Sequence, residues 1–203
     1  MNALRGHAAE FGIVAAKGTG QTGTLLERIA ADPAVPAAAQ EMFSELGERV
    51  GELVGRLRAL ERKLAKLHKA NPVSQVLAEV PGIGPITALT LAMTVDATQF
   101  RSGRHFAAWL GLTPKQNSTG GKPRLGGISR EGNERLRQLL VIGATSVVKL
   151  AKPGHRFGTA WLLGLVQRRP RKVAAVALAN KMARVVWAMM TSGEAYRPQP
   201  SAR

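Results

Sequence analysis

The sequence predicts an all-α fold, in which a long coiled-coil helix precedes a compact helical domain. Apolar residues make up 45% of the 203 residues, but aromatic residues only 4%. The core must therefore consist of Leu, Val and Ala, and Leu and Ala favour helices over strands. Apolar residues also recur with helical spacing in several segments, whereas no segment shows the convincing alternation of a half-buried strand.

Basic residues are concentrated in the second half of the chain. Residues 1–100 hold 10 Lys or Arg and 10 Asp or Glu, whereas residues 101–203 hold 19 Lys or Arg and three acids, so the second half carries the whole formal charge of +16. A compact domain with this excess repels itself unless a polyanion neutralises it. Nucleic acid is the polyanion that we expect, bound with a steep dependence on salt. A basic surface that only aids solubility is the alternative.

The chain has no Cys, which excludes disulfides and thiolate metal sites and fits a cytoplasmic protein. The first twenty residues lack the apolar core of a signal peptide. The longest apolar region, residues 173–190, is interrupted by Asn180, Lys181 and Arg184. We therefore expect a buried helix there and no membrane span.

Residues 1–36 are expected to be the remnant of a linker, because their mixed polarity and Gly/Thr-rich loop cannot form a core alone. Residues 37–70 carry a heptad seam, with apolar side chains at Phe43, Leu46, Val50, Leu53, Leu57, Leu60, Leu64 and Leu67. Gly47, Gly51 and Gly55 lie off this seam, and each costs about 1 kcal/mol relative to Ala. We expect the helix to be held by pairing in a homo-oligomer; packing within the chain is the alternative.

Residues 71–203 are predicted to form the compact helical domain. Asn71 and Pro72 begin a short helix, Asn133 caps a helix that runs to about Leu150, and a long helix over residues 172–191 ends at Gly193. A further short helix is expected to close at Gly111.

The sequence PGIGP, residues 81–85, lies between two of the short helices and resembles a helix-hairpin-helix element. Gly82 and Gly84 permit a tight turn whose backbone N–H groups can meet DNA phosphates at the start of the second helix. The alternative is a purely structural connector.

The segment TPKQNSTGGKPRLGGISREGNERLR, residues 113–137, holds five Gly and six Lys or Arg and is too polar to pack a core. Glycines allow a close approach to phosphate, and cations stabilise the charge that grows when a phosphate is attacked. The residues expected to contact DNA are Gly82, Gly84, Gly120, Gly121, Lys122, Arg124 and Arg130. Ser118 and Thr119 are candidate nucleophiles, although no base or carboxylate adjoins them, so a loop that only contacts DNA is favoured by the residues alone.

No metal site is expected in this chain. Beyond Val80 the acids are Asp96, Glu131, Glu134 and Glu194, and no pair has a convincing spacing for metal ligands. Asp96 is expected to cap a helix or form an ion pair.

Three motifs in this order resemble the C-terminal domain of insertion-sequence transposases of the IS110 type, the DEDD transposases that act as bridge-RNA-guided recombinases. The motifs are VPGIGPITALTL from Val80, F-x5-FAAWLGLTP from Phe100 and NSTGGKPRLGGISREGNERLRQLL from Asn117. The opening LRGHAAEFGIVA also resembles the segment that follows the first domain of that family. The resemblance spans nearly the whole chain.

The resemblance implies a DNA-binding transposase, of which this chain is the C-terminal part. The family places a serine before a glycine of the Gly-rich loop as the nucleophile, which is Ser118 by residue type or Thr119 by register. Four acidic ligands of an N-terminal RuvC-like domain complete the site; that domain is missing here, so Mg²⁺ is expected only with it, and the chain is expected to be inactive alone.

The partners implied by the resemblance are DNA, a guide (bridge) RNA and further copies of the chain, joined through the coiled coil. The alternative function is a non-catalytic, nucleic-acid-binding regulator that oligomerises with an intact transposase.

Overall fold

A computed structural model describes residues 2–122 and 124–198. The chain forms two compact units, residues 1–63 and residues 64–203. The predicted fold class is confirmed, because the described residues are mostly helical and hold one small two-stranded sheet.

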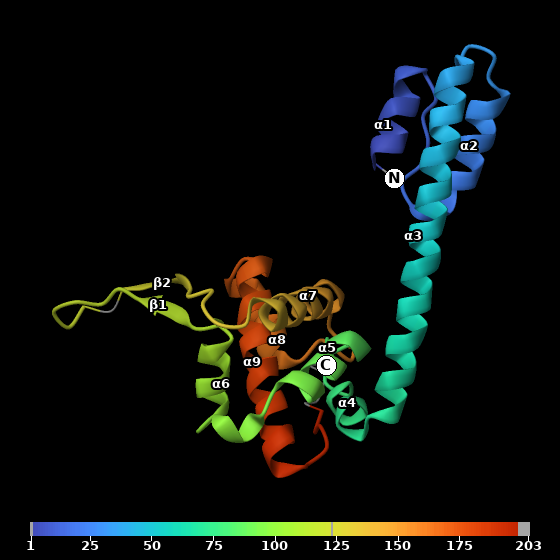
Figure 1. Cartoon of the computed structure of the whole chain (residues 1–203). Coiled ribbons are helices and arrows are strands. Elements are labelled where there is room, and N and C mark those ends of the chain that lie inside the picture. The colour runs from blue at the N-terminus through green and yellow to red at the C-terminus, as the bar shows by residue number, and fades with distance from the viewer. Residues whose placement is uncertain (1, 123, 199–203) are drawn as a thin grey trace. The chain divides into compact units, whose positions relative to one another are not determined.

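The first unit consists of α1 (Asn2–Glu10), the 3-10 turn η1 (Thr19–Gln21), α2 (Thr22–Ala31) and the first part of α3 (Ala37–Ala70), which lies beside them (Figure 1). Its core is small and includes side chains from both sides of residue 36: Leu4, Ala8, Ile13, Leu25, Ile29, Val35 and Phe43. The first 36 residues thus contribute two helices, and α3 completes the core that they share. Gly47 of α3 is buried because α2 packs closely there: an added Cβ would collide with the side chain of Leu26.

Helix α3 has the bounds that the heptad pattern predicts, residues 37–70. The start of the heptad seam, Phe43 and Leu46, packs into the core of the first unit. Farther along, Leu53, Leu57 and Leu60 are 63%, 56% and 57% exposed. Pairing of this part of the seam with another helix stays a prediction.

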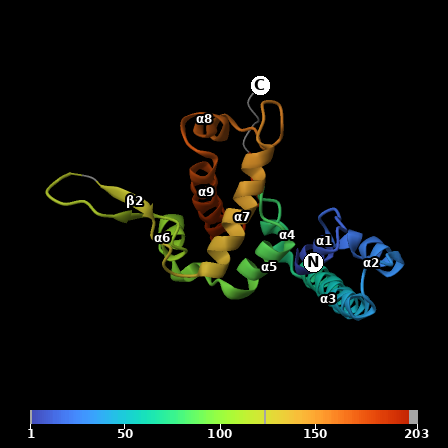
Figure 2. The same ribbon diagram turned by 90° about the horizontal axis from the view of Figure 1, so that it is seen from above.

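The second unit surrounds a central helix, α9 (Arg171–Ser192), which contacts α6 (Gly103–Trp109), α7 (Glu134–Leu150) and α8 (Ala160–Arg168). The short helices α4 (Pro72–Leu77) and α5 (Pro85–Thr94) and the turn η2 (Ala97–Gln99) complete it. Figure 2 shows α7 and α9 side by side. Helices α4 to α9 all contribute to one apolar core, which includes Leu77, Leu91, Phe106, Leu140, Leu162 and Ala179.

The predicted helix ends of this unit are confirmed. The Asn71 side chain accepts a hydrogen bond from the backbone N–H of Ser74 at 2.8 Å, and the Asn133 side chain accepts one from Leu136 at 3.0 Å. Gly193 ends α9 in the left-handed region, with φ at 71°. These caps satisfy backbone groups that a helix leaves unpaired at its ends.

Of the helices that the structure describes, α9 alone is long and apolar enough to cross a membrane. Its apolar face, which includes Ala174, Ala179, Ala183 and Val186, is buried in the core of the second unit. The apolar composition is therefore explained by core packing, as the sequence predicts.

The Gly-rich segment forms an element that the sequence does not predict, an antiparallel hairpin of β1 (Pro114–Gln116) and β2 (Leu125–Ile128). Pro114 pairs with Ile128 and Gln116 with Leu125, with an irregularity between them. Neither face of the hairpin is buried. Its strands therefore need no alternation of apolar and polar side chains, which is the pattern that predicts a strand from sequence. The hairpin projects from the helices of the second unit (Figures 1 and 2).

Candidate nucleic-acid interface

The base of the hairpin is fixed to the helical core by backbone hydrogen bonds. The N–H of Ser129 donates to the carbonyl of Thr113 at 2.9 Å, and the N–H of Arg130 donates to the carbonyl of Gly111 at 3.2 Å. The side-chain amide of Asn180 on α9 also donates to the carbonyl of Leu112 at 3.2 Å. The projecting strands therefore start from a defined position.

Arg137 on α7 holds the two ends of the hairpin segment together from within the core. Its buried guanidinium donates to the carbonyls of Leu110, at 3.1 Å, and Glu131, at 2.9 Å, and so joins the two ends of the hairpin segment. Sequence reasoning did not single out Arg137 or Asn180, because their partners are backbone carbonyls distant in the sequence. The sequence signal that could have identified Arg137 is its place between Leu136 and Leu140 in the helix predicted from Asn133, where a charged side chain is unexpected in a core.

Two glycines make this close approach possible. Gly111 has φ at +69° and Gly132 at +80°, in the region that side chains rarely adopt. A Cβ at Gly132 would also collide with the carbonyl of Trp109, and one at Gly111 with the backbone of Glu131.

The tip of the hairpin is a tight turn over Thr119–Gly120–Gly121–Lys122. The N–H of Lys122 donates to the carbonyl of Thr119 at 3.1 Å, and φ is +56° at Gly120 and +75° at Gly121. Positive φ at both central residues is what a type I′ hairpin turn requires. No described atom lies within 4 Å of a Cβ added at either glycine. The open backbone can thus come close to a phosphate.

The two candidate nucleophiles differ in their surroundings. The hydroxyl oxygen of half-buried Ser118 accepts a hydrogen bond from the backbone N–H of Arg124 at 2.8 Å, which orients it across the hairpin. A donor to this oxygen also favours the negatively charged form that an attacking hydroxyl passes through. The exposed hydroxyl of Thr119 makes no hydrogen bond with any residue that the structure describes. The geometry thus favours Ser118 as the oriented hydroxyl.

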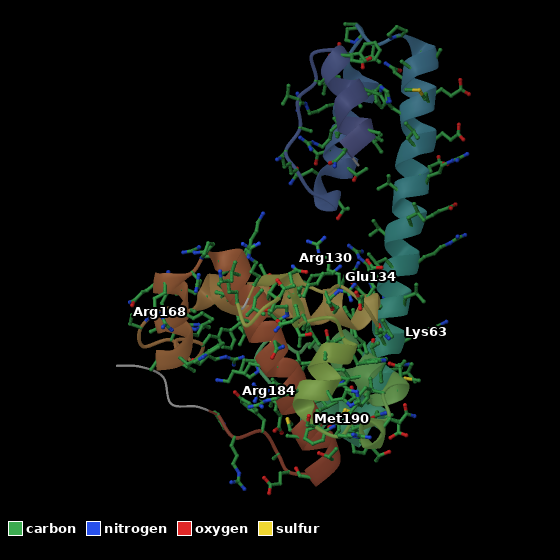
Figure 3. The ribbon with its side chains drawn as sticks, turned by 90° about the vertical axis from the view of Figure 1, so that its left-hand side faces the viewer. Lys63, Arg130, Glu134, Arg168, Arg184 and Met190 are labelled. Carbon is green, nitrogen blue, oxygen red and sulfur yellow. The ribbon has the colours of Figure 1, made fainter. Side chains whose placement is uncertain are left out.

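The hairpin, residues 114–130, carries four cations and no acid. Lys115, Lys122, Arg124 and Arg130 are all exposed. Lys115 was not among the predicted contacts, because its place on the strand beside the turn is visible only in the structure. Arg130, labelled in Figure 3, has φ at 59°, the one positive value for a non-glycine in the described ranges. The hairpin is therefore a surface of concentrated positive charge, which is the kind of surface that attracts polyanions.

The PGIGP element joins α4 to α5, and its two glycines have different surroundings. Gly82 has φ at +89° and faces α7, where an added Cβ would approach the carbonyl oxygen of Gly143 to 2.9 Å. Gly84 is exposed at the start of α5, with no described neighbour within 4 Å of an added Cβ. Gly82 therefore allows the turn to pack closely on α7. The predicted contact with phosphate stays sterically open at Gly84 and not at Gly82.

The described residues contain no group of three or more His, Cys, Asp or Glu that could hold a metal ion. The capping role predicted for Asp96 is confirmed: its carboxylate accepts hydrogen bonds from the hydroxyl of Thr98 at 2.6 Å and from its N–H at 3.0 Å. These bonds hold the pKa of Asp96 below its usual value.

Comparison with known proteins shows what the chain is similar to. The sequence pattern of the transposase family IS116/IS110/IS902 matches residues 74–158. Protein y4pF/y4sB of Sinorhizobium fredii, which bears a provisional transposase name, is 56% identical over 97% of this chain and 51% of its own length. A Pseudomonas aeruginosa protein, provisionally named a family 20 transposase, is 46% identical over 97% of this chain and 60% of its own length.

The transposase for insertion sequence element IS1111A of Coxiella burnetii is 37% identical, over 97% of this chain and 55% of its own length. The chain therefore spans between half and three fifths of the length of these relatives. The family match covers the PGIGP element, the whole hairpin and Arg137.

Proposed function

Because the chain belongs to the IS116/IS110/IS902 family of insertion-sequence transposases, we propose that it binds the DNA of such an element and supplies a hydroxyl nucleophile for its transposition. The observation that carries this proposal is the hairpin. It holds Ser118 and Thr119 beside an open Gly–Gly turn, among four cations and no acid.

The chemistry assigned to Ser118 is an attack on a DNA phosphodiester. A bond forms between the serine Oγ and phosphorus, and the bond from phosphorus to one deoxyribose oxygen breaks. The hydroxyl proton leaves for solvent or for a base outside the hairpin, since residues 114–130 hold neither His nor an acid, and the released oxygen takes up a proton. The nearby cations and backbone N–H groups stabilise the charge that develops on the phosphoryl oxygens.

Mg²⁺ does not fit any group of acids in the part of the chain that the structure describes, so no step of this reaction is assigned to a metal held here. Mg²⁺ bound by an acidic domain of an intact transposase is the proposal that the family resemblance supports. A guide RNA as a further partner and a cytoplasmic location rest on the same resemblance.

The test is strand joining by a chimera, in which residues 1–203 replace the matching segment of y4pF/y4sB, the 56%-identical relative. The unmodified relative must first join the ends of its own element in the assay. We expect Ser118→Ala to lower the joining rate by at least about 10³-fold, because the attacking oxygen is removed. Thr119→Ala is expected to lower it less than tenfold. Near-normal rates in both variants would exclude the hairpin from the reaction.

We also propose that the exposed part of the heptad seam joins copies of this chain. Leu53, Leu57 and Leu60 lie at a and d positions, and more than half of each side chain is exposed. Burying such a stripe against an identical helix removes apolar surface from water, at about 25 cal/mol per Å². Light scattering of the purified chain is expected to give a dimer or a larger oligomer, and a monomer for Leu53→Asp/Leu60→Asp.

The matched control is Glu52→Asp/Glu61→Asp, which changes two exposed seam neighbours without adding charge to the seam. A monomeric parent chain would contradict the pairing. The same seam supports a second candidate function, a regulator that forms mixed oligomers with an intact transposase. Co-purification with a full-length relative, lost in the Leu53→Asp/Leu60→Asp variant, would support that role.

A further inference from the structure

A groove of about 1330 Å³ lies at the foot of the hairpin, within the second unit. The N-terminus of α6, the strand β2 at Gly126, Gly127 and Ile128, Trp161 of α8 and one side of α9 line it. Its size exceeds that of a typical small-molecule pocket and admits several linked aromatic rings. It will be called the α9 groove.

The α9 groove combines apolar side chains with several cations. Its apolar lining residues include Val173, Val176, Ala177 and Val185. Its cations are Arg104, Lys172, Lys181 and Arg184, and none of the described residues that line it is Asp or Glu. Figure 3 shows Arg184 on α9. A ligand that complements this lining has apolar or aromatic faces and several negative charges.

Trp161 supplies an aromatic surface in the groove. Its side chain is 39% exposed, and the ammonium of Lys181 lies 4.4 Å from the centre of its ring. Burial and the neighbouring Arg184 lower the pKa of Lys181. An anion beside Lys181 and Arg184 would relieve the repulsion between them, so the site is electrostatically suited to a phosphate.

Unpaired nucleotides match both properties. A duplex presents its phosphates outward and keeps its base faces stacked, so it can contact the cations of the groove but cannot place a base face on its apolar side chains. A base outside the duplex exposes a face that stacks on an aromatic side chain, while its phosphates meet cations. An acidic peptide is the competing ligand, but the groove continues into the hairpin, whose four cations and hydroxyls are assigned to DNA above.

The distance along the hairpin supports a DNA strand. A Cβ at Gly126 would lie 3.7 Å from the carbonyl oxygen of Lys115, so Ser118 is three residues farther toward the tip. Three residues of strand span about 10 Å, which is the rise of about three stacked nucleotides. A strand attacked at Ser118 can therefore reach the groove within a few nucleotides.

We propose that the α9 groove binds unpaired nucleotides of the DNA strand that meets the hairpin. A base lies against Trp161, and phosphates lie against the four cations of the groove, Arg104, Lys172, Lys181 and Arg184. This inference rests on the proposed function, because that function brings DNA to the hairpin. The groove holds the strand open a few nucleotides from the phosphate that Ser118 attacks.

Fluorescence anisotropy on the purified chain tests this with two single-stranded DNA probes of equal length and charge, an oligothymidylate and its fully abasic analogue. The wild-type chain is expected to bind the probe with bases about tenfold more tightly, as one good stacking contact provides. Trp161→Ala is expected to bind both probes equally, and Trp161→Phe to keep most of the preference. Ala177→Phe, which places a bulky ring on the α9 wall of the groove and leaves Trp161 in place, is expected to weaken the preference as well.

Arg168→Ala is the matched control, because this exposed cation at the end of α8 does not line the groove (Figure 3). It is expected to leave the ratio between the two probes unchanged. A preference that survives in both Trp161→Ala and Ala177→Phe would overturn the proposal. Tighter, Trp161-dependent binding of the matching oligoribonucleotide would also overturn it, in favour of RNA.

A duplex probe separates this inference from the proposed function. If the chain binds duplex DNA through Lys122 and Arg124 but shows no preference for bases in single strands, the groove proposal fails alone. If duplex binding is also independent of the hairpin cations, the proposed function fails with it.

Discussion

Arg137 is the one charged side chain that is buried among the described residues, and it makes two hydrogen bonds with carbonyls. A buried cation is costly unless its donors are paired, and here both carbonyls belong to the ends of the hairpin segment. The residue therefore positions the hairpin.

Replacing Arg137 with Met is expected to destabilise the second unit by roughly 2–3 kcal/mol, because the carbonyls of Leu110 and Glu131 lose a charged donor. Urea unfolding followed by circular dichroism measures this. Arg135→Met, an exposed neighbour on the same helix, is expected to change the unfolding free energy by less than about 0.5 kcal/mol. Equal stability of the two variants would mean that Arg137 is not a brace.

Some of the residues of the candidate site could be predicted from the sequence, and others could not. Ser118, Thr119 and three of the four hairpin cations could be named in advance, because their residue types define the chemistry that they can perform; Lys115 was the exception. The hydrogen bond from Arg124 to Ser118 could not, since it depends on the pairing of two strands with no buried face. Arg137 and Asn180 were missed for a related reason: their roles lie in contacts with backbone distant in the sequence.

Helices were predictable where an apolar face or a capping residue marked them. The bounds of α3 and the caps at Asn71 and Asn133 follow from local patterns, and the structure agrees with them. Helices α1 and α2 were not foreseen, because only four of their residues carry large apolar side chains that reach the core, Leu4, Leu25, Leu26 and Ile29. Their stability comes from packing on α3, which a local pattern does not encode.

Contact between the PGIGP element and α7 requires glycine on both sides. A Cβ at Gly143 of α7 would collide with the carbonyl of Gly82, whereas a Cβ at Gly164 of α8 would have no described neighbour within 4 Å. Both residues lie inside helices, so their intrinsic helix propensities are the same. Alanine substitutions at these two positions therefore distinguish the effect of close packing from that of helix propensity.

Gly143→Ala is expected to lower the free energy of unfolding by about 1–2 kcal/mol, since overpacking outweighs the gain in helix propensity. Gly164→Ala is expected to raise it by up to about 1 kcal/mol, because only the propensity changes. Urea unfolding midpoints at constant m-value measure both. Stabilisation by Gly143→Ala would show that the PGIGP element does not pack closely on α7.

The charge of the molecule follows the division into two units. Residues 64–203 hold 21 Lys or Arg and five acids, whereas residues 1–63 hold eight of each. All sixteen excess charges therefore belong to the unit that carries the hairpin, the PGIGP element and the α9 groove. The first unit, which contains most of the exposed seam, is neutral, as suits a part that is proposed to contact other protein chains.

This division predicts where the salt dependence of DNA binding originates. Each phosphate contact contributes about 0.9 to the slope of log K against log salt concentration, so Lys122→Ala/Arg124→Ala is expected to flatten the slope by about 2 and to weaken binding equally for unrelated duplexes. Arg56→Ala/Arg58→Ala removes the same charge from exposed positions of α3 in the neutral unit and is expected to leave the slope unchanged. Anisotropy titrations between 50 and 300 mM NaCl, roughly the range over which such slopes are linear, provide the measurement. If both double variants flatten the slope alike, net charge and not the hairpin governs binding, and the hairpin loses its assignment as the surface that meets phosphate.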